Sequence, residues 1–322
     1  MLTALGAIVL GLALLIWSAD QFISGAIESA RELGLSPMLI GLTLVAFGTS
    51  APEVLVSVMA AVTGAGDVAV GNAIGSNIAN LSLVLGLTAV ITPLAVAGPT
   101  RRLEIPLLAG ITLGTWVLFI DDYLGPADGF LMLAILAASF TVLVRYGQAA
   151  TILTAEVPDP HPTSTAIIVV QILGGLLVLL GSSRLLVWGA VEFALIMGVS
   201  ELVVGLTVVA VGTSLPELGA GIASALKGRH DMVLGNLIGS NLFNLLLVLA
   251  VPAIVAGIPL NQDAVTRDYG AMVLVTFLLA GIALIAARTG HIGRSSGVIL
   301  LGLYVSYIVI ILVVDAPAPA VL

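Results

Sequence analysis

Long apolar stretches separated by short polar breaks run along the whole chain. Each stretch is long enough to cross the roughly 30 Å of hydrocarbon in a bilayer as a helix. The pattern predicts ten membrane-spanning helices, at 3–30, 36–62, 68–92, 103–120, 126–145, 165–194, 202–226, 232–257, 269–288 and 295–314. The first and sixth are unusually long, so we expect both to tilt strongly.

The chain also repeats itself without a gap. Gly41–Glu53 reads GLTLVAFGTSAPE and Gly205–Glu217 reads GLTVVAVGTSLPE, so the two segments share ten of thirteen positions. Gly71–Asn80 reads GNAIGSNIAN and Gly235–Asn244 reads GNLIGSNLFN, which share seven of ten positions at the same spacing. Chance similarity between apolar segments would not also align Gly, Pro, Asn and Glu. The chain is therefore a duplication.

Each copy holds five predicted spans, and an odd number makes the second copy enter the membrane from the opposite side. We therefore predict an all-α membrane protein made of two inverted five-helix repeats, 1–145 and 165–322, joined by a short cytoplasmic connector at 146–164. This architecture is typical of secondary transporters, whose binding sites lie near the midplane between the repeats.

The basic residues set the expected orientation. If the loops alternate sides, eight Lys and Arg residues fall on one side and only Arg267 falls on the other. The basic side is normally cytoplasmic. We expect a multi-pass protein of the inner (plasma) membrane with both termini on the extracytoplasmic side. The first apolar run has no basic residue ahead of it, which favours a membrane helix over a cleaved signal peptide.

Composition narrows the class of protein. Hydrophobic residues make up 60% of the chain and charged residues 9%, whereas a soluble protein carries about a quarter charged residues. The absence of cysteine excludes disulfides and thiolate metal sites, and the three histidines lie at spacings that suit no metal cage. We expect neither an enzyme nor a nucleic-acid-binding protein.

Two glutamates lie in the middle of predicted spans. Glu53 and Glu217 are equivalent in the repeat, and each follows a proline. An acid at this depth costs several kcal/mol without partners, so it indicates a functional site. Proline removes a backbone donor and breaks the helix. We expect this break to free the carbonyls of Ala46 and Ala210 as cation ligands at the negative end of a half-helix.

The polar atoms around these glutamates suit calcium, which prefers six to eight hard oxygen ligands. Two carboxylates would balance the charge of one Ca²⁺. The neutral oxygens would allow Na⁺ ions to replace it. Buried asparagine amides in the second motif would also need partners, which favours a role in lining or supporting the site. The candidate metal-binding residues are Glu53, Glu217, Thr49, Thr213, Ala46, Ala210, Ser50, Ser214, Ser76, Ser240, Asn80 and Asn244.

The paired G-T-S-x-P-E and G-N-x-x-G-S-N motifs resemble the alpha repeats of the cation/calcium exchanger superfamily, over essentially the whole chain. The sequence is most similar to the prokaryotic sodium/calcium exchangers. The resemblance implies that helices 2, 3, 7 and 8 form the broken-helix core, with motifs at 41–57, 71–80, 205–221 and 235–244. It also implies that helices 1 and 6 slide across this core.

The same resemblance implies individual roles. Ca²⁺ would be bound by Glu53, Glu217, Thr49 and Thr213. Flanking Na⁺ sites would use Ala46, Ser50 and Ser76 with Glu53, and Ala210, Ser214 and Ser240 with Glu217. Asn80 and Asn244 would line the middle of the cluster. Related exchangers often carry Asp at the position of Asn244, so this chain has lost a titratable group there, which argues against the potassium-dependent branch.

The expected function is antiport of Ca²⁺ and Na⁺ by alternating access, with electrogenic Ca²⁺ extrusion. The ions are substrates; we expect no cofactor and no obligate protein partner besides the lipid bilayer. A proton-coupled exchanger of Ca²⁺ or another divalent cation is the main alternative. A passive channel and an intramembrane hydrolase with two acids remain open as further alternatives.

Overall fold

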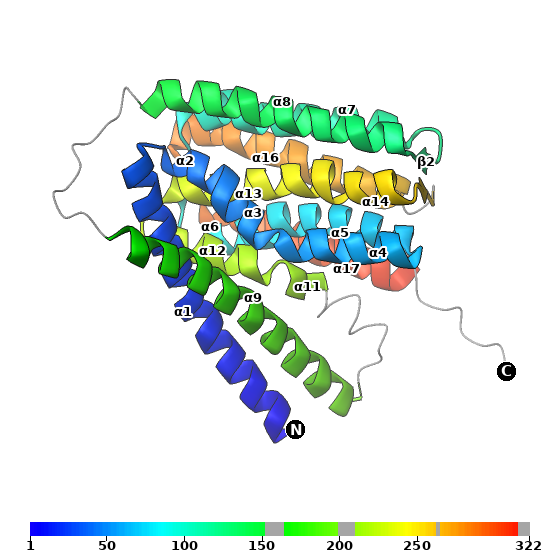
Figure 1. The fold of residues 1–322 in the computed structure, drawn as a ribbon, viewed down its shortest axis with the longest axis horizontal. Helices are drawn as coiled ribbons and strands as arrows, with labels where there is room; N and C mark the ends of the chain where they lie inside the picture. The colour runs from blue at the N-terminus through cyan, green and yellow to red at the C-terminus, as the bar shows by residue number, and fades with distance from the viewer. Residues whose placement is uncertain (152–163, 199–209, 262–264, 315–322) are drawn as a thin grey trace.

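The computed structural model describes residues 1–151, 164–198, 210–261 and 265–314. Helices make up nearly all of it (Figure 1). The first half contains α1 (Leu2–Leu33), α2 (Pro37–Ile40), η1 (Gly41–Val45), α3 (Ala46–Thr49), α4 (Ala51–Thr63), α5 (Gly66–Ala79), η2 (Asn80–Val84), α6 (Leu85–Ile91), β1 (Leu94–Ala95), η3 (Thr100–Glu104), α7 (Ile105–Thr115), η4 (Trp116–Phe119), β2 (Tyr123–Leu124) and α8 (Pro126–Thr151).

The second half has a similar order of elements. It contains α9 (Thr165–Ile196), α11 (Ala210–Thr213), α12 (Leu215–Leu226), α13 (His230–Phe243), η6 (Asn244–Val248), α14 (Ala250–Val255), β3 (Ile258–Pro259), η7 (Val265–Tyr269), α16 (Gly270–Thr289), β4 (His291–Ile292) and α17 (Arg294–Val314).

Nine of the predicted spans correspond to helices in the described part of the chain. Among the described residues, eight helices are long and apolar enough to cross a membrane, and the pair Pro37–Thr49 and Ala51–Thr63 makes a ninth span that is bent by 45°. The predicted span 202–226 lies partly outside the described residues, which include only α11 and α12 from it. The chain is thus an all-helical membrane protein by the length and composition of its helices.

Four short strands are an addition that the apolar pattern did not predict. Leu94 pairs with Ile292, and Leu124 pairs with Ile258, in two antiparallel ladders of two residues per strand. Each ladder joins a loop of the first half to a loop of the second half. Strands this short leave no signal in hydropathy, because the pairing depends on which loops the helices bring together.

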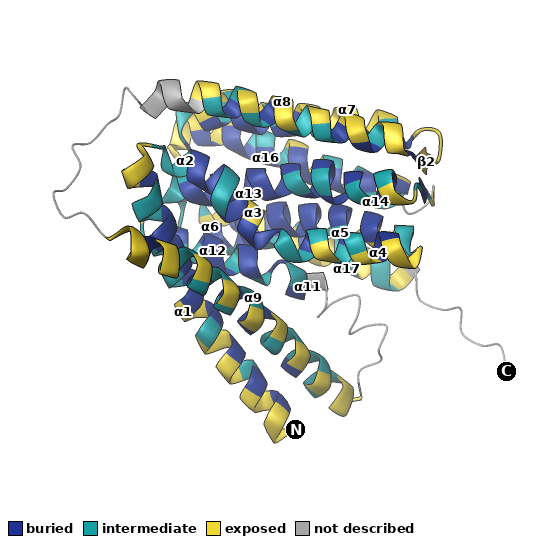
Figure 2. Ribbon diagram, viewed as in Figure 1, coloured by how far each residue is buried: buried dark blue, intermediate teal, exposed yellow. Residues whose placement is uncertain are grey.

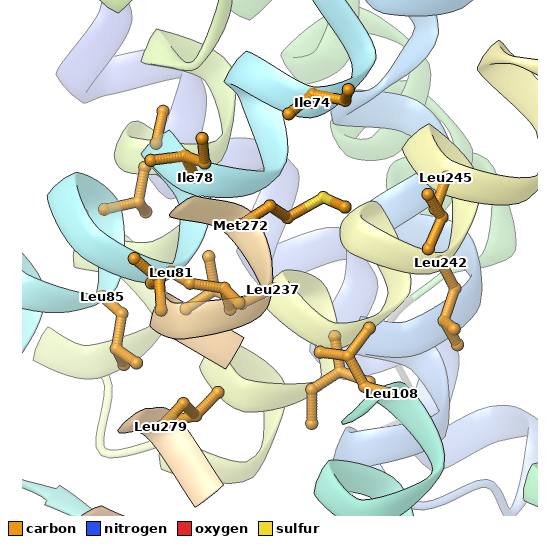
Figure 3. Packing of buried hydrophobic residues seen from close by; sticks show 14 of the residues in the cluster. Ile74, Ile78, Leu81, Leu85, Leu108, Leu237, Leu242, Leu245, Met272 and Leu279 are labelled. Carbon is orange, nitrogen blue, oxygen red and sulfur yellow. The ribbon is translucent and has the colours of Figure 1, made fainter. Parts of the chain in front are cut away.

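Two long helical rods form the centre of the bundle. They are Gly66–Ile91, from α5 to α6, and His230–Val255, from α13 to α14, and 72% of the apolar stretch of each is buried. Buried positions concentrate along them in Figure 2. Figure 3 shows side chains of both rods, such as Ile78 and Leu242, packed around Met272 of α16. This apolar core fixes the rods that carry the second motif of each repeat.

The α1 and α9 helices lie side by side and antiparallel, and they leave the bundle at an oblique angle (Figure 1). Each has 32 residues, or about 48 Å of helix. Two glycines permit their close approach: a Cβ at Gly11 would lie 2.8 Å from the backbone nitrogen of Leu186, and one at Gly175 would lie 2.7 Å from that of Phe22. These contacts are equivalent under the repeat.

Candidate cation-binding site

Both glutamates lie in the first turn of a helix that begins after a break. The first break falls at Ser50, between α3 and α4, and the second at Ser214, between α11 and α12. Pro52 and Pro216 occupy the start of α4 and α12, where a missing N–H costs nothing because the first helical donors have no partner within the helix. The positive end of each helix dipole therefore faces the glutamate of its own first turn.

The break does not free the Ala46 carbonyl, contrary to the expectation from the sequence. The Ser50 N–H donates to this carbonyl at 3.0 Å, and the Thr49 hydroxyl lies 3.4 Å from it. The reason is the position of Pro52. The N–H that this proline lacks would have donated to the carbonyl of Gly48, four residues back, and not to that of Ala46. In the second half, the Ser214 N–H donates to Val211 at 3.1 Å. A role for Ala46 would have to use the second lone pair of its carbonyl oxygen.

Most candidate residues are buried together in the interior. Ala46, Thr49, Ser50, Glu53, Ser76, Asn80, Ser214, Glu217, Ser240 and Asn244 are all at most 4% exposed. Thr213 is partly buried, and the side chain of Ala210 lies outside the described residues. The polar motifs are therefore interior features of an apolar bundle.

Hydrogen bonds across the repeat join the two halves at this point. The Ser50 hydroxyl donates to Glu217 Oε1 at 3.4 Å. The Thr49 hydroxyl donates to Asn236 Oδ1 of α13 at 3.3 Å. The first broken helix thus meets both motifs of the second half.

The rods that face the breaks widen at two equivalent asparagines. A π-helical turn begins at Asn80 in η2 and another begins at Asn244 in η6. Such turns shift the backbone hydrogen bonds from i→i−4 to i→i−5 and occur often at functional sites. The sequence motif identified both asparagines, but its helical periodicity gives no sign of a single wider turn.

Many polar atoms of the cluster have no hydrogen-bond partner within the described residues. They include both carboxylate oxygens of Glu53, Glu217 Oε2, the Ser214 and Ser240 hydroxyls, and the amide groups of Asn80 and Asn244. None of the three ion pairs among the described residues involves either glutamate. Leaving buried polar atoms unpaired is costly, and more so for charged groups. The arrangement is suited to a cation that several oxygens share.

The donor set limits which cations fit. The described residues contain no group of three or more His, Cys, Asp or Glu side chains placed to hold a metal ion. A cation here would be held by two carboxylates and by neutral hydroxyl, amide and carbonyl oxygens. Such hard oxygen donors suit Ca²⁺ and Na⁺ rather than Zn²⁺ or Cu⁺.

Two asparagines that the sequence did not single out as ligands support the site. Asn72 donates from Nδ2 to the backbone carbonyl of Glu53 at 3.3 Å, and Asn236 accepts from Thr49. They are equivalent in the repeat and form the second position of each G-N-x-x-G-S-N motif. The motif could have identified both asparagines. It could not predict their different hydrogen-bond partners, because those depend on the packing of helices far apart in the chain.

Comparison with known proteins gives consistent results. The family model described as sodium/calcium exchanger protein matches residues 3–145 and 167–313. The inner membrane protein YrbG of Escherichia coli is 37% identical over 317 residues, which cover 96% of each chain. The sodium/calcium exchanger MaX1 of Methanosarcina acetivorans is 29% identical over 94% of this chain and 97% of its own. A structure of the sodium-calcium exchanger NCX_Mj superimposes with a TM-score of 0.82 and 33% identity, and covers 96% of this chain and 99% of NCX_Mj.

Proposed function

Because the chain belongs to the sodium/calcium exchanger family, we propose that it exchanges Ca²⁺ for Na⁺ across the membrane by alternating access. The family model accounts for nearly all of both halves, so the inference does not rest on a fragment. Membership in this family makes the chain a membrane transporter rather than an enzyme. The relatives whose names state their ions are sodium/calcium exchangers over nearly the whole chain, and sodium/potassium/calcium exchangers over at most half of it.

The observation that carries the proposal is the pair of buried carboxylates. Glu53 and Glu217 are 1% and 0% exposed, and three of their four oxygens lack a hydrogen-bond partner in the described part of the chain. An uncompensated buried charge costs about 3–5 kcal/mol. One divalent cation between the two glutamates would neutralise both, and neutral oxygens nearby would let Na⁺ take its place.

The proposed ligands divide into a central site and two flanking sites. Ca²⁺ binds Glu53, Glu217, Thr49 and Thr213 at the centre, and Na⁺ binds on either side. One flanking site uses Ala46, Ser50, Ser76 and Glu53; the other uses Ala210, Ser214, Ser240 and Glu217; Asn80 and Asn244 line the space between them. The unpaired oxygens of Ser214, Ser240, Asn80 and Asn244 support this division.

The proposed architecture has ten spans in two inverted repeats, 1–145 and 165–322, with the connector 146–164 in the cytoplasm and both termini outside. Helices 2, 3, 7 and 8 form the ion-binding core. Supporting observations are the equivalent contacts of Gly11 and Gly175 and the paired π-helical turns. The pair α1 and α9 moves along the core to change access. We place the protein in the inner membrane, as the name of YrbG states for that relative.

Exchange is electrogenic in this proposal. The two glutamates balance one Ca²⁺, whereas a load of more than two Na⁺ leaves the site positive. A potential that is negative inside then favours Na⁺ entry and Ca²⁺ exit, at about 2.3 kcal/mol per net charge per 100 mV. With Asn at both 80 and 244, no further carboxylate in the cluster offsets this charge.

The test is ⁴⁵Ca²⁺ uptake into proteoliposomes under separate gradients. We expect uptake with Na⁺ inside and none with choline inside, and we expect a K⁺ potential set by valinomycin to change the rate. Uptake driven by a pH gradient without Na⁺ would identify the proton-coupled exchanger instead. Ca²⁺ flux that needs no counter-ion would identify a channel.

A further inference from the structure

We propose that Asn236 is a positioning residue that makes the Thr49 hydroxyl a ligand for the bound cation; the inference rests on the proposed function. Thr49 ends α3 in the first half, and Asn236 lies on α13 in the second half. Their side chains meet across the repeat, with Thr49 Oγ1 3.3 Å from Asn236 Oδ1. Thr49 is 0% exposed and Asn236 is 1% exposed, so protein groups determine where the hydroxyl hydrogen points.

The Thr49 hydroxyl has one hydrogen and two acceptors at hydrogen-bond distance. They are the Ala46 carbonyl at 3.4 Å and Asn236 Oδ1 at 3.3 Å. To bind a cation, the hydroxyl must turn a lone pair toward the ion and point its hydrogen elsewhere. If the hydroxyl hydrogen instead points at another oxygen that binds the cation, the hydrogen lies close to the cation, and its partial positive charge is repelled.

Asn236 is the acceptor of these two that lies outside the proposed ligand set. Ala46 is itself a proposed ligand, so a cation competes with the Thr49 hydrogen for its carbonyl oxygen. The Asn236 amide oxygen keeps its lone pairs for Thr49. The hydrogen bond to Asn236 therefore holds the hydroxyl in the orientation that binding requires, as outer partners do for ligands at metal sites.

The equivalent asparagine of the first half makes a different contact. Asn72 uses its Nδ2 to donate to the Glu53 backbone carbonyl, whereas Asn236 uses its oxygen to accept from a side chain. Asn236 Nδ2 has no hydrogen-bond partner among the described residues. Burying this amide leaves its N–H donor unpaired, which is unfavourable. Packing alone would not offset that, whereas the hydrogen bond of its oxygen to Thr49 does. Asn72 is thus a matched control.

The experiment is a double-mutant cycle read by Ca²⁺ binding rather than by transport. Purified protein in detergent is heated at increasing Ca²⁺ concentrations, and the rise in Tm gives an apparent Kd. Asn236→Ala is expected to weaken Ca²⁺ binding about tenfold to a hundredfold. In a Thr49→Val background, Asn236→Ala is expected to change the apparent Kd for Ca²⁺ by about twofold or less. Asn72→Ala should have the same effect in both backgrounds.

Two further variants keep the proposal falsifiable. Asn236→Asp retains an acceptor oxygen and is expected to bind Ca²⁺ at least as tightly as wild type. If Asn236→Ala does not fold, Asn236→Leu replaces it, since it has the same branching of heavy atoms and no acceptor. Equal losses in both Thr49 backgrounds, or a loss in Asn236→Asp as large as in Asn236→Ala, would overturn the inference. Wild-type protein with no Ca²⁺-dependent rise in Tm would overturn the proposed function itself.

Discussion

The two broken helices have nearly the same sequence but different contacts. Around the first break, both oxygens of Glu53 are unpaired within the described residues, and the Ser50 N–H makes the regular bond to Ala46. Around the second, Glu217 Oε1 accepts from Ser50, and the Ser214 N–H reaches only three residues back, to Val211. Duplication therefore produced two glutamates that are equivalent by sequence but not by environment.

This difference suggests a division of roles between the halves. Glu217 accepts a hydrogen bond from the Ser50 hydroxyl of the first half, so its position depends on how the halves meet. The backbone carbonyl of Glu53 accepts from Asn72, and its carboxylate oxygens have no partner among the described residues and are available to an ion. A cation between them would complete the contact that the two halves leave open.

The largest expected effect comes from removing one of these charges. Glu53→Gln and Glu217→Gln should each lower Ca²⁺ transport at least a hundredfold, because an unbalanced buried charge costs about 3–5 kcal/mol. We expect Glu53→Gln to be the more severe change, since it alters the carboxylate with both oxygens unpaired. Gradient-driven ⁴⁵Ca²⁺ uptake measures this loss. Asp121→Asn, the same chemical change at an exposed loop, is the control and should transport normally.

A second prediction tests whether the halves are inverted. Val62 and Leu226 are equivalent in the repeat, lie near the ends of α4 and α12, and are 72% and 68% exposed. The chain has no native cysteine, so Val62→Cys and Leu226→Cys give single labelling sites. A membrane-impermeant thiol reagent should label Val62→Cys only from outside and Leu226→Cys only from the cytoplasm. Labelling of both from the same side would mean that the repeats are parallel.

The smallest expected effect separates the two serines at the breaks. Ser50→Ala removes a hydrogen bond to Glu217 and should lower the free energy of unfolding by up to about 1 kcal/mol. Ser214→Ala removes a hydroxyl that has no partner in the described part of the chain, so its stability should stay unchanged. Its Na⁺ dependence of Ca²⁺ uptake should instead shift to higher Na⁺. Equal losses of stability in both variants would contradict the difference between the breaks.

The sequence alone predicted most of the fold. Apolar runs marked nine of the helices now described within a few residues, because a membrane span must be apolar along its whole length. The proline before each glutamate marked the breaks at Ser50 and Ser214. The short strands were missed because two-residue pairings carry no periodic pattern.

The sequence predicted which residues make up the candidate site, but it did not predict the hydrogen bonds between them. Motif residues such as Asn80 and Glu53 were identified because a polar side chain is costly in hydrocarbon without a role. The expectation of a free Ala46 carbonyl was wrong, because the donor that Pro52 lacks would have reached Gly48, whereas the Ser50 N–H reaches Ala46. The bond from Thr49 to Asn236 was not predicted, because it depends on the packing of two halves whose motifs look alike.

The central claim is that the two halves form one shared Ca²⁺ site, and Ca²⁺ binding to single and double glutamate variants tests it most directly. Equilibrium binding of ⁴⁵Ca²⁺ would be measured on wild type, Glu53→Gln, Glu217→Gln and the double variant. One central Ca²⁺ per chain is expected in wild type, and each single variant should lose it almost as completely as the double variant. Two independent sites, with each single variant retaining one bound Ca²⁺ that only the double variant loses, would contradict the account.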